Sequence, residues 1–231
     1  MNRTKIEWTH APGRTGYTWN PITGCRHGCG YCYARPFAKR LQGMGVPGYE
    51  AGFEPTFHPT RILEPTTVKQ PGFVFTVSMG DMFGHWVPFT WINDVFSVAE
   101  QCPQHVFAVL TKNPSKIQDW HDAGGRIPDN VWLGVSVTTM DEAWRISVLW
   151  SVPGTGVRFV SLEPIRGPVD REYLTGLDWL IVGSQTGAGA PKPDQQLVNK
   201  MVKVAERLER PIFVKANTGL DGPRQWPGGV S

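Results

Sequence analysis

The feature that most constrains the fold is a repeated alternation of short apolar segments with longer helical ones. The predicted strands are Tyr17–Ile22, Phe73–Ser78, Val106–Leu110, Val131–Val137, Val157–Leu162, Trp179–Gly183 and Ile212–Lys215. The predicted helices are Tyr33–Met44, Phe89–Gln101, Pro114–Asp122, Met140–Trp150 and Asp194–Leu208, with shorter ones near Pro59–Leu63 and Asp170–Thr175. Strands that are apolar on both faces indicate a parallel sheet, and repeated βα units imply right-handed crossovers. We therefore expect one α/β domain spanning residues 1–231, built as a partial barrel with helices outside.

Polar side chains follow most of the predicted strands. They occur at Ser78–Asp81, Thr111–Lys112, Ser136–Thr138, Glu163–Pro164, Ser184–Gln185 and Lys215–Asn217. Because βα barrels build their active sites at the carboxyl ends of the strands, we expect a site at this rim. The candidate catalytic residues are Lys112, Glu163 and Lys215, and Gln185 and Asn217 are candidate substrate-binding residues.

Three of the four cysteines lie within eight residues, in the loop that follows the first predicted strand. Cys25, Cys29 and Cys32 have the spacing C-x3-C-x2-C. Thiolates are the ligands of iron–sulfur clusters, and a [4Fe–4S] cluster needs four of them to be saturated. Three cysteines would leave one iron open to a substrate or cofactor. Glycines at positions 24, 28 and 30 would let the backbone curl tightly around a cluster.

This loop, with Tyr31 before its third cysteine, resembles the signature of the radical S-adenosylmethionine (SAM) enzymes. A closer resemblance, to a family of phage-encoded radical-SAM-like proteins, extends over most of the chain. It is carried by Lys5–Thr9, Trp19–Pro21, Ser78–Phe83, Leu110–Lys112, Trp132–Ser136 and Ser161–Pro164. The resemblance implies a partial (βα)6 barrel in which the open iron binds SAM. One-electron cleavage of SAM would then give a 5′-deoxyadenosyl radical that abstracts hydrogen from the substrate.

The resemblance also implies roles for individual residues. The three cysteines would hold the cluster, and Tyr31 would lie against the adenine of SAM. A Gly-Gly-Glu segment is common after the second strand, where this chain has Ser78-Met79-Gly80-Asp81; Ser78 or Asp81 would meet the methionyl amine instead. Further cofactor contacts would come from Gly80, Ser136, Thr138 and Glu163. Glu163 is costly to bury unpaired, so we expect Lys215 or a SAM amine or ribose to satisfy it.

Zinc is the main alternative ligand of the cysteine loop. The three cysteines with His27 could form a structural Cys3His site, and the protein would then be a nucleic-acid-binding module without catalysis. However, His27 lies between two of the cysteines, and no second cysteine pair exists in the sequence. This arrangement favours the iron–sulfur cluster.

Composition bears on compartment and substrate. No signal peptide or transmembrane stretch is expected, and the cysteine pattern favours a reducing cytoplasm, that of the host if the protein is phage-encoded. A net charge of +3 is compatible with nucleic acid. We expect isomerisation or another modification of a hypermodified thymine in phage DNA, with Trp86 and Trp226 as candidate stacking residues. Repair of a base lesion by a lyase and peptide modification are alternatives.

The remaining expectations concern partners and lids. A monomer is expected, reduced by a reductase or a flavodoxin-type donor. The Gly- and Pro-rich segments 47–71 and 218–231 are predicted to form lids over the site.

Overall fold

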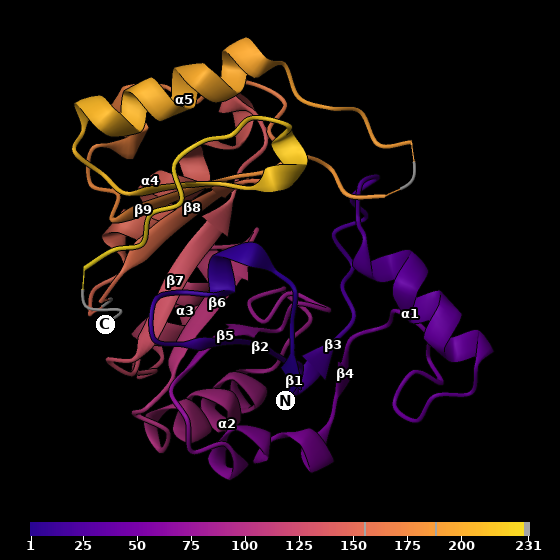
Figure 1. Ribbon diagram of the computed structural model, residues 1–231. Helices are drawn as coiled ribbons and strands as arrows, with labels where there is room; N and C mark the ends of the chain where they lie inside the picture. Colours follow the sequence, from indigo (N-terminus) through magenta and orange to yellow (C-terminus); the bar gives the residue numbers. More distant parts are fainter. Residues whose placement is uncertain (155, 188, 229–231) are drawn as a thin grey trace.

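The computed structural model describes residues 1–154, 156–187 and 189–228. An eight-stranded sheet has the order β1-β2-β5-β6-β7-β8-β9-β10 and is parallel throughout, except that β1 pairs antiparallel with β2. The strands are β1 (Asn2–Arg3), β2 (Thr15–Trp19), β5 (Gly72–Thr76), β6 (Val106–Thr111), β7 (Val131–Ser136), β8 (Arg158–Leu162), β9 (Trp179–Val182) and β10 (Ile212–Val214). The sheet curls into a half-barrel (Figure 1), which confirms the predicted α/β class.

Helices α2 (Phe89–Glu100), α3 (Ser115–Asp122), α4 (Trp144–Ser151) and α5 (Gln195–Arg207) connect successive parallel strands. Because the parallel strands follow one another in sequence order, right-handed crossovers bring all four helices to the outer face of the sheet. Short 3-10 helices lie at Glu7–Thr9, Pro59–Arg61, Glu64–Thr67, Met140–Glu142, Arg171–Leu174 and Ala216–Thr218. Helix α1 (Ala34–Gly43) is different, because it projects beyond the edge of the sheet (Figure 1).

Aromatic side chains fill the hollow of the half-barrel near the amino ends of the strands. Phe73, Trp132 and Trp179 pack there around Trp8, whose ring centroid lies 6.0 Å from that of Trp179. Trp8 comes from the segment that precedes β2. This segment bridges the two edges of the sheet, because the Glu7 carboxylate accepts a hydrogen bond from the backbone N–H of Ala216, just after β10. The part of the interior near the amino ends of the strands is therefore filled with packed side chains.

Every predicted strand and helix has a counterpart in the structure, with ends shifted by a few residues. The sequence patterns missed a two-stranded sheet formed by β3 (Ile22–Thr23) and β4 (Thr56–Phe57). Strand β3 overlaps the end of the predicted strand Tyr17–Ile22, and β4 lies within the predicted lid 47–71. Segment 47–71 contains β4 and supports the cysteine loop from below, because Phe53 accepts a hydrogen bond from the Cys25 backbone N–H. The segment is therefore packed against the cysteine loop and also lines the site.

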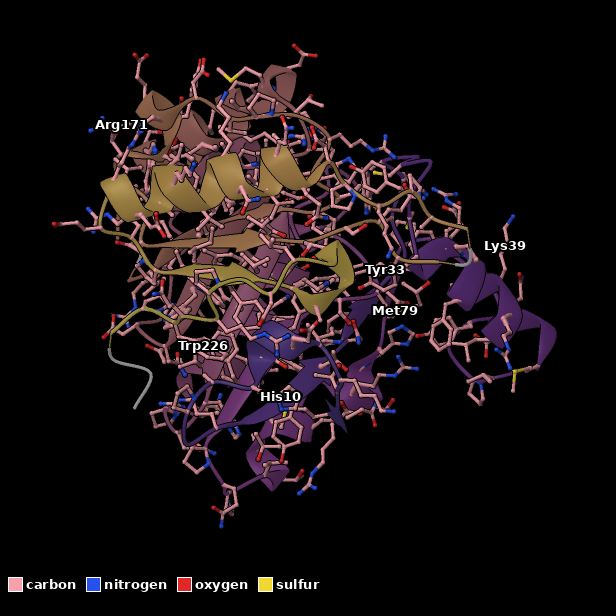
Figure 2. The ribbon with its side chains drawn as sticks, turned by 45° about the horizontal axis from the view of Figure 1, so that its top comes forward. His10, Tyr33, Lys39, Met79, Arg171 and Trp226 are labelled. Atoms are coloured by element: carbon pink, nitrogen blue, oxygen red, sulfur yellow. The ribbon has the colours of Figure 1, made fainter. Side chains whose placement is uncertain are left out.

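The predicted lid at 218–231 lies elsewhere within its described residues, 218–228. The chain runs back along β10, with the backbone N–H of Gln225 donating to the carbonyl of Ile212. Trp226 then packs on Phe213 and donates to the Trp8 carbonyl, well away from Tyr33 at the base of α1 (Figure 2). Residues 223–226 of the tail therefore pair with β10 and pack towards the amino end of the barrel. Among the described residues, no helix has the length and apolar character needed to span a membrane.

Candidate functional site

The cysteine loop joins β3 to α1 and is held against the loop that follows β5. The backbone N–H of Gly24 donates to the carbonyl of Met79 over 2.9 Å, and Gly24 and Gly80 form a β-bridge. A Cβ atom at Gly80 would lie 2.8 Å from the Gly24 carbonyl oxygen, so these two chains approach as closely as backbone allows. Gly24 and Gly28 have φ values of +87° and +71°, which favour glycine. The predicted turn chemistry is thus confirmed at two of the three loop glycines, whereas Gly30 has no positive φ.

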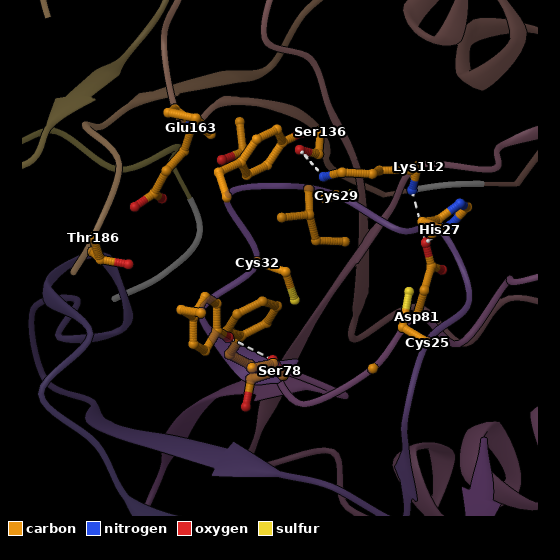
Figure 3. Close-up of a pocket in the computed structure, with 18 of the residues that line it drawn as sticks. Cys25, His27, Cys29, Cys32, Ser78, Asp81, Lys112, Ser136, Glu163 and Thr186 are labelled. Atoms are coloured by element: carbon orange, nitrogen blue, oxygen red, sulfur yellow. Dashed lines mark hydrogen bonds and ion pairs between the residues drawn. The ribbon is translucent and has the colours of Figure 1, made fainter. Parts of the chain in front are cut away.

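A cavity of about 340 Å³ opens at the carboxyl ends of the strands, where the site was predicted. This volume lies within the range of about 300–1,000 Å³ typical of ligand pockets. The predicted residues that line it are Cys25, Cys29, Tyr31, Cys32, Ser78, Gly80, Asp81, Lys112, Ser136, Glu163, Gln185 and Lys215. Figure 3 shows Cys29 and Cys32 between two polar groups, with Glu163 and Thr186 on one side and Lys112, His27 and Asp81 on the other, where Cys25 also lies.

The three loop cysteines are free thiols, half-buried in the cavity wall. Burial raises the pKa of the Cys25 thiol to about 12, so this group is protonated until a metal displaces its proton. The fourth cysteine, Cys102, is buried in the hydrophobic core and does not line the cavity. Three thiols that border one cavity are the ligand number of a cluster that keeps one iron free of protein ligands.

A single metal ion makes a different demand on the same loop. Its ligands must converge on one point, as the four ligands of a structural zinc do. No group of three or more His, Cys, Asp or Glu side chains within residues 1–154, 156–187 and 189–228 converges in this way. The His27 ring nitrogen Nε2 lies 2.8 Å from Asp81 instead. The His27 ring is thus engaged by Asp81, and within the described residues the same lack of convergence applies to the three thiols as ligands of any metal centre.

Asp81 anchors the cysteine loop to the rim of the barrel. Its buried carboxylate accepts hydrogen bonds at 2.7–3.0 Å from the Phe83 and Lys112 backbone N–H groups and the Thr111 hydroxyl, in addition to the His27 contact. Burial alone would raise the pKa of Asp81, but the bonds from His27, Lys112 and Thr111 outweigh it and hold the pKa below its usual value. A carboxylate has about four acceptor positions, and all are used here. Asp81 therefore serves as a structural clamp with no acceptor position left for the methionyl amine.

Unlike Asp81, whose charge is fully paired, Lys112 places a positively charged side chain inside the cavity. Its ammonium donates to the Ser136 hydroxyl at 2.7 Å and lies 5.5 Å from the centroid of the Tyr31 ring. Arg166 lies 4.7 Å from the same centroid and also donates to the Gln185 side chain. Tyr31 is thus held between the cysteine loop and two cations.

Glu163 and Lys215 form an ion pair across the ends of β8 and β10. Lys215 is therefore the partner of the Glu163 carboxylate, which was one of the two partners expected from the sequence. The pair meets over Gly183, where a Cβ atom would lie 2.8 Å from Lys215 Cδ and 2.9 Å from Glu163 Cδ. The absence of a side chain at position 183 is what lets the two charges approach.

Two predicted site residues lie outside the cavity lining. Thr138 donates from both its backbone N–H and its hydroxyl to the Glu142 carboxylate, which stiffens the turn after β7. Asn217 exchanges two hydrogen bonds with the Ser184 backbone, at 3.0 Å each. Asn217 thus holds the cavity-lining residue Ser184, whereas the partner of the Thr138 side chain, Glu142, lies outside the lining.

Sequence reasoning missed several lining residues. They are Ile6, Trp8, Tyr33, Ala34, Phe53, Phe75, Val77, Leu110, Ser161 and Thr186. The lining also includes Thr111, Pro164 and Ser184, which the sequence placed at the predicted rim, and His27 of the cysteine loop. Strand alternation could have found Ser161, which is two residues before Glu163 and shares its face. Nothing local distinguishes Trp8, which reaches the cavity only because the amino-terminal segment bridges the sheet edges. Trp86 and Trp226, predicted as stacking residues, are partly buried and packed against other side chains.

Comparison with known proteins places the chain in a family and gives no further likeness. No curated protein and no solved structure matches the chain significantly. A family model described as "Protein of unknown function (DUF5131)" matches residues 3–221, which is nearly the whole chain. The matched range includes the cysteine loop and every strand end that lines the cavity. The chain therefore belongs to the DUF5131 family.

Proposed function

We propose that this protein is a radical SAM enzyme whose [4Fe–4S] cluster is held by Cys25, Cys29 and Cys32. One observation carries the proposal: the three thiols line one cavity at the carboxyl ends of parallel strands, and no fourth cysteine lines it. When bound, the cluster and SAM supply one-electron cleavage of the sulfonium and a 5′-deoxyadenosyl radical that abstracts hydrogen. A reductase or flavodoxin-type protein is the proposed electron donor. The curled, mostly parallel sheet supports the proposal, because a partial barrel of parallel strands is the fold that the resemblance implies.

The chain's own residues divide the cavity into parts with different chemistry. Trp8, Phe75 and Leu110 form an apolar floor that excludes water from a reactive site. The Glu163–Lys215 pair lies at one side and offers an acceptor for an amine or hydroxyl together with a donor for an acid. Lys112, which has the neutral Ser136 hydroxyl as its hydrogen-bond acceptor among the described residues, offers a charge for a carboxylate or phosphate. SAM and a polar substrate would each find partners on these walls.

We further propose modification of a nucleic-acid base, with isomerisation of a hypermodified thymine in phage DNA as the reaction to test first. An isomerisation returns the abstracted hydrogen to the rearranged substrate, so the product has the mass of the substrate. Lys112, which lines the cavity, and Arg166, which lies against the Tyr31 ring, support an anionic substrate.

The test is anaerobic reconstitution of the full chain with iron and sulfide, followed by absorption and low-temperature EPR spectroscopy with dithionite. We expect an iron–sulfur signal that changes on adding SAM, and formation of 5′-deoxyadenosine. The chain offers a matched control: Cys102→Ala should keep the cluster, whereas Cys25→Ala, Cys29→Ala and Cys32→Ala should each lose it. A colourless protein that binds one zinc and produces no deoxyadenosine would overturn the proposal.

A further inference from the structure

Helix α1 carries an exposed apolar stripe that no described part of the protein covers. Tyr33, Phe37 and Met44 are 50%, 48% and 65% exposed, and with Arg40 they are spaced four, three and four residues apart. This spacing places all four side chains on one face of a helix. The buried side chains of α1, Ala34 and Ala38, lie on another face and pack toward Phe53 and Met79. We call the four exposed side chains the α1 stripe.

The segment around the stripe is the most basic part of the protein. Residues 26–49 contain Arg26, Arg35, Lys39 and Arg40 and no acidic residue, whereas the remainder of the chain has a formal charge of −1. Lys39 and Arg40 form no hydrogen bond or ion pair with any described side chain, and Figure 2 shows Lys39 directed away from the body of the protein. Unpaired cations beside exposed aromatic rings indicate an anionic partner that also presents flat apolar groups.

The size of the stripe narrows the kind of partner. A ten-residue helix is about 15 Å long and about 10 Å wide, so one face offers roughly 150 Å². A standard protein–protein interface buries about 800 Å² on each partner. Single-stranded nucleic acid needs less, because proteins bind it with a few stacked bases and phosphate contacts over about 4 nucleotides or more.

We propose that the α1 stripe is the docking surface for single-stranded nucleic acid, with bases stacked on Phe37 and Tyr33 and a phosphate on Arg40. Tyr33 belongs to both the stripe and the cavity wall, and its hydroxyl donates to the Ser78 carbonyl. A strand bound on the stripe therefore presents its next base at the cavity mouth, unpaired as base-modifying enzymes require. The inference rests on the proposed function only in treating the cavity as the place where that base reacts; the binding itself requires neither cluster nor SAM.

The test is fluorescence anisotropy of a labelled 12-nucleotide oligothymidylate with the full chain, measured with and without reconstituted cluster. We expect Phe37→Leu to weaken binding about tenfold, the loss typical of one base stack, and Phe37→Tyr to retain it. Arg40→Glu should weaken binding and make the slope of log affinity against log salt shallower by about 0.7 for each phosphate that Arg40 neutralises. Arg207→Glu, an exposed arginine of α5, is the matched control and should bind as wild type does.

Two outcomes would contradict the inference. A third would separate the docking surface from the proposed chemistry. Equal affinities for wild type, Phe37→Leu and Arg40→Glu would show that nucleic acid does not use the stripe. Failure of the wild-type protein to bind the oligonucleotide at 50 mM salt, with binding of an acidic flavodoxin that Arg40→Glu abolishes, would assign the stripe to the electron donor. Oligonucleotide binding without any deoxyadenosine formation would uphold the docking surface and count against the proposed chemistry alone, so the two failures are distinguishable.

Discussion

The Asp81 clamp makes the sharpest prediction, because one buried carboxylate joins the cysteine loop to two other loops. Replacing Asp81 with Ala leaves the Thr111 hydroxyl and the Phe83 and Lys112 backbone N–H groups without their acceptor. Each hydrogen bond to a charged group contributes about 1.5–3 kcal/mol, but the losses are not additive because the cost of burying the charge disappears too. Each buried donor left without an acceptor costs about 1–3 kcal/mol, so with partial compensation we expect Asp81→Ala to lose about 3–5 kcal/mol in total.

Asp81→Asn is the milder change and tests the same reasoning. The amide keeps one oxygen for Thr111 and Phe83, but its NH2 group faces other donors, so we expect a loss of about 1–3 kcal/mol. Total stabilities of about 5–15 kcal/mol should leave both variants folded. The assay is urea unfolding followed by tryptophan fluorescence, together with the rate at which iodoacetamide alkylates the loop cysteines, which should rise as the loop loosens.

Asp94→Asn, an exposed site on α2, is the matched control for this prediction and should change stability by no more than about 0.5 kcal/mol. The clamp reasoning is refuted if Asp81→Asn unfolds at the same urea concentration as Asp94→Asn and its cysteines react no faster. An unchanged alkylation rate with reduced stability would limit the role of Asp81 to the barrel rim.

Three further changes have defined outcomes. Gly80→Ala should reduce cluster content by pushing the cysteine loop off the rim, whereas Gly30→Ala, with nothing within 4 Å of its added methyl, should reconstitute normally in an iron assay. Gly183→Ala should destabilise the protein by about 1–3 kcal/mol in urea unfolding by forcing the adjacent ion pair apart; Gly167→Ala, at 3.7 Å from its neighbours, should not. Burial, followed by the nearby Arg61 charge, lowers the pKa of His58 to about 4, so the folded state resists protonation and stability should fall as pH drops from about 6.5 to 4, by on the order of 1–3 kcal/mol. His58→Gln should remove this part of the pH dependence, and an unchanged slope would contradict it.

Much of the fold and the position of the site could be predicted from local sequence patterns. Apolar runs identified every parallel strand, because a strand buried on both faces has few alternatives at that length. The rim followed from the same pattern, since parallel strands all end at one edge. The pairing of Glu163 with Lys215 was also foreseeable, because an acid after one apolar strand needs a partner and a lysine follows another.

Other features depend on contacts that no local pattern encodes. Asp81 finds its partners 30 and 54 residues away in sequence, at Thr111 and His27, so its saturation by protein donors is a tertiary result. The two-residue strands β3 and β4 are too short to show any periodicity. The exposed face of α1 has the sequence of an ordinary amphipathic surface helix, and only its projection from the sheet reveals that no described residue covers it.

Gly183 shows how the two kinds of information combine. A glycine at a strand end is usually explained by a turn, yet Gly183 has no positive φ and needs no special backbone. Its neighbours supply the reason, since a Cβ atom there would lie within 3.0 Å of both members of the Glu163–Lys215 pair. A glycine at this position therefore keeps an acid and a base in contact at the cavity wall.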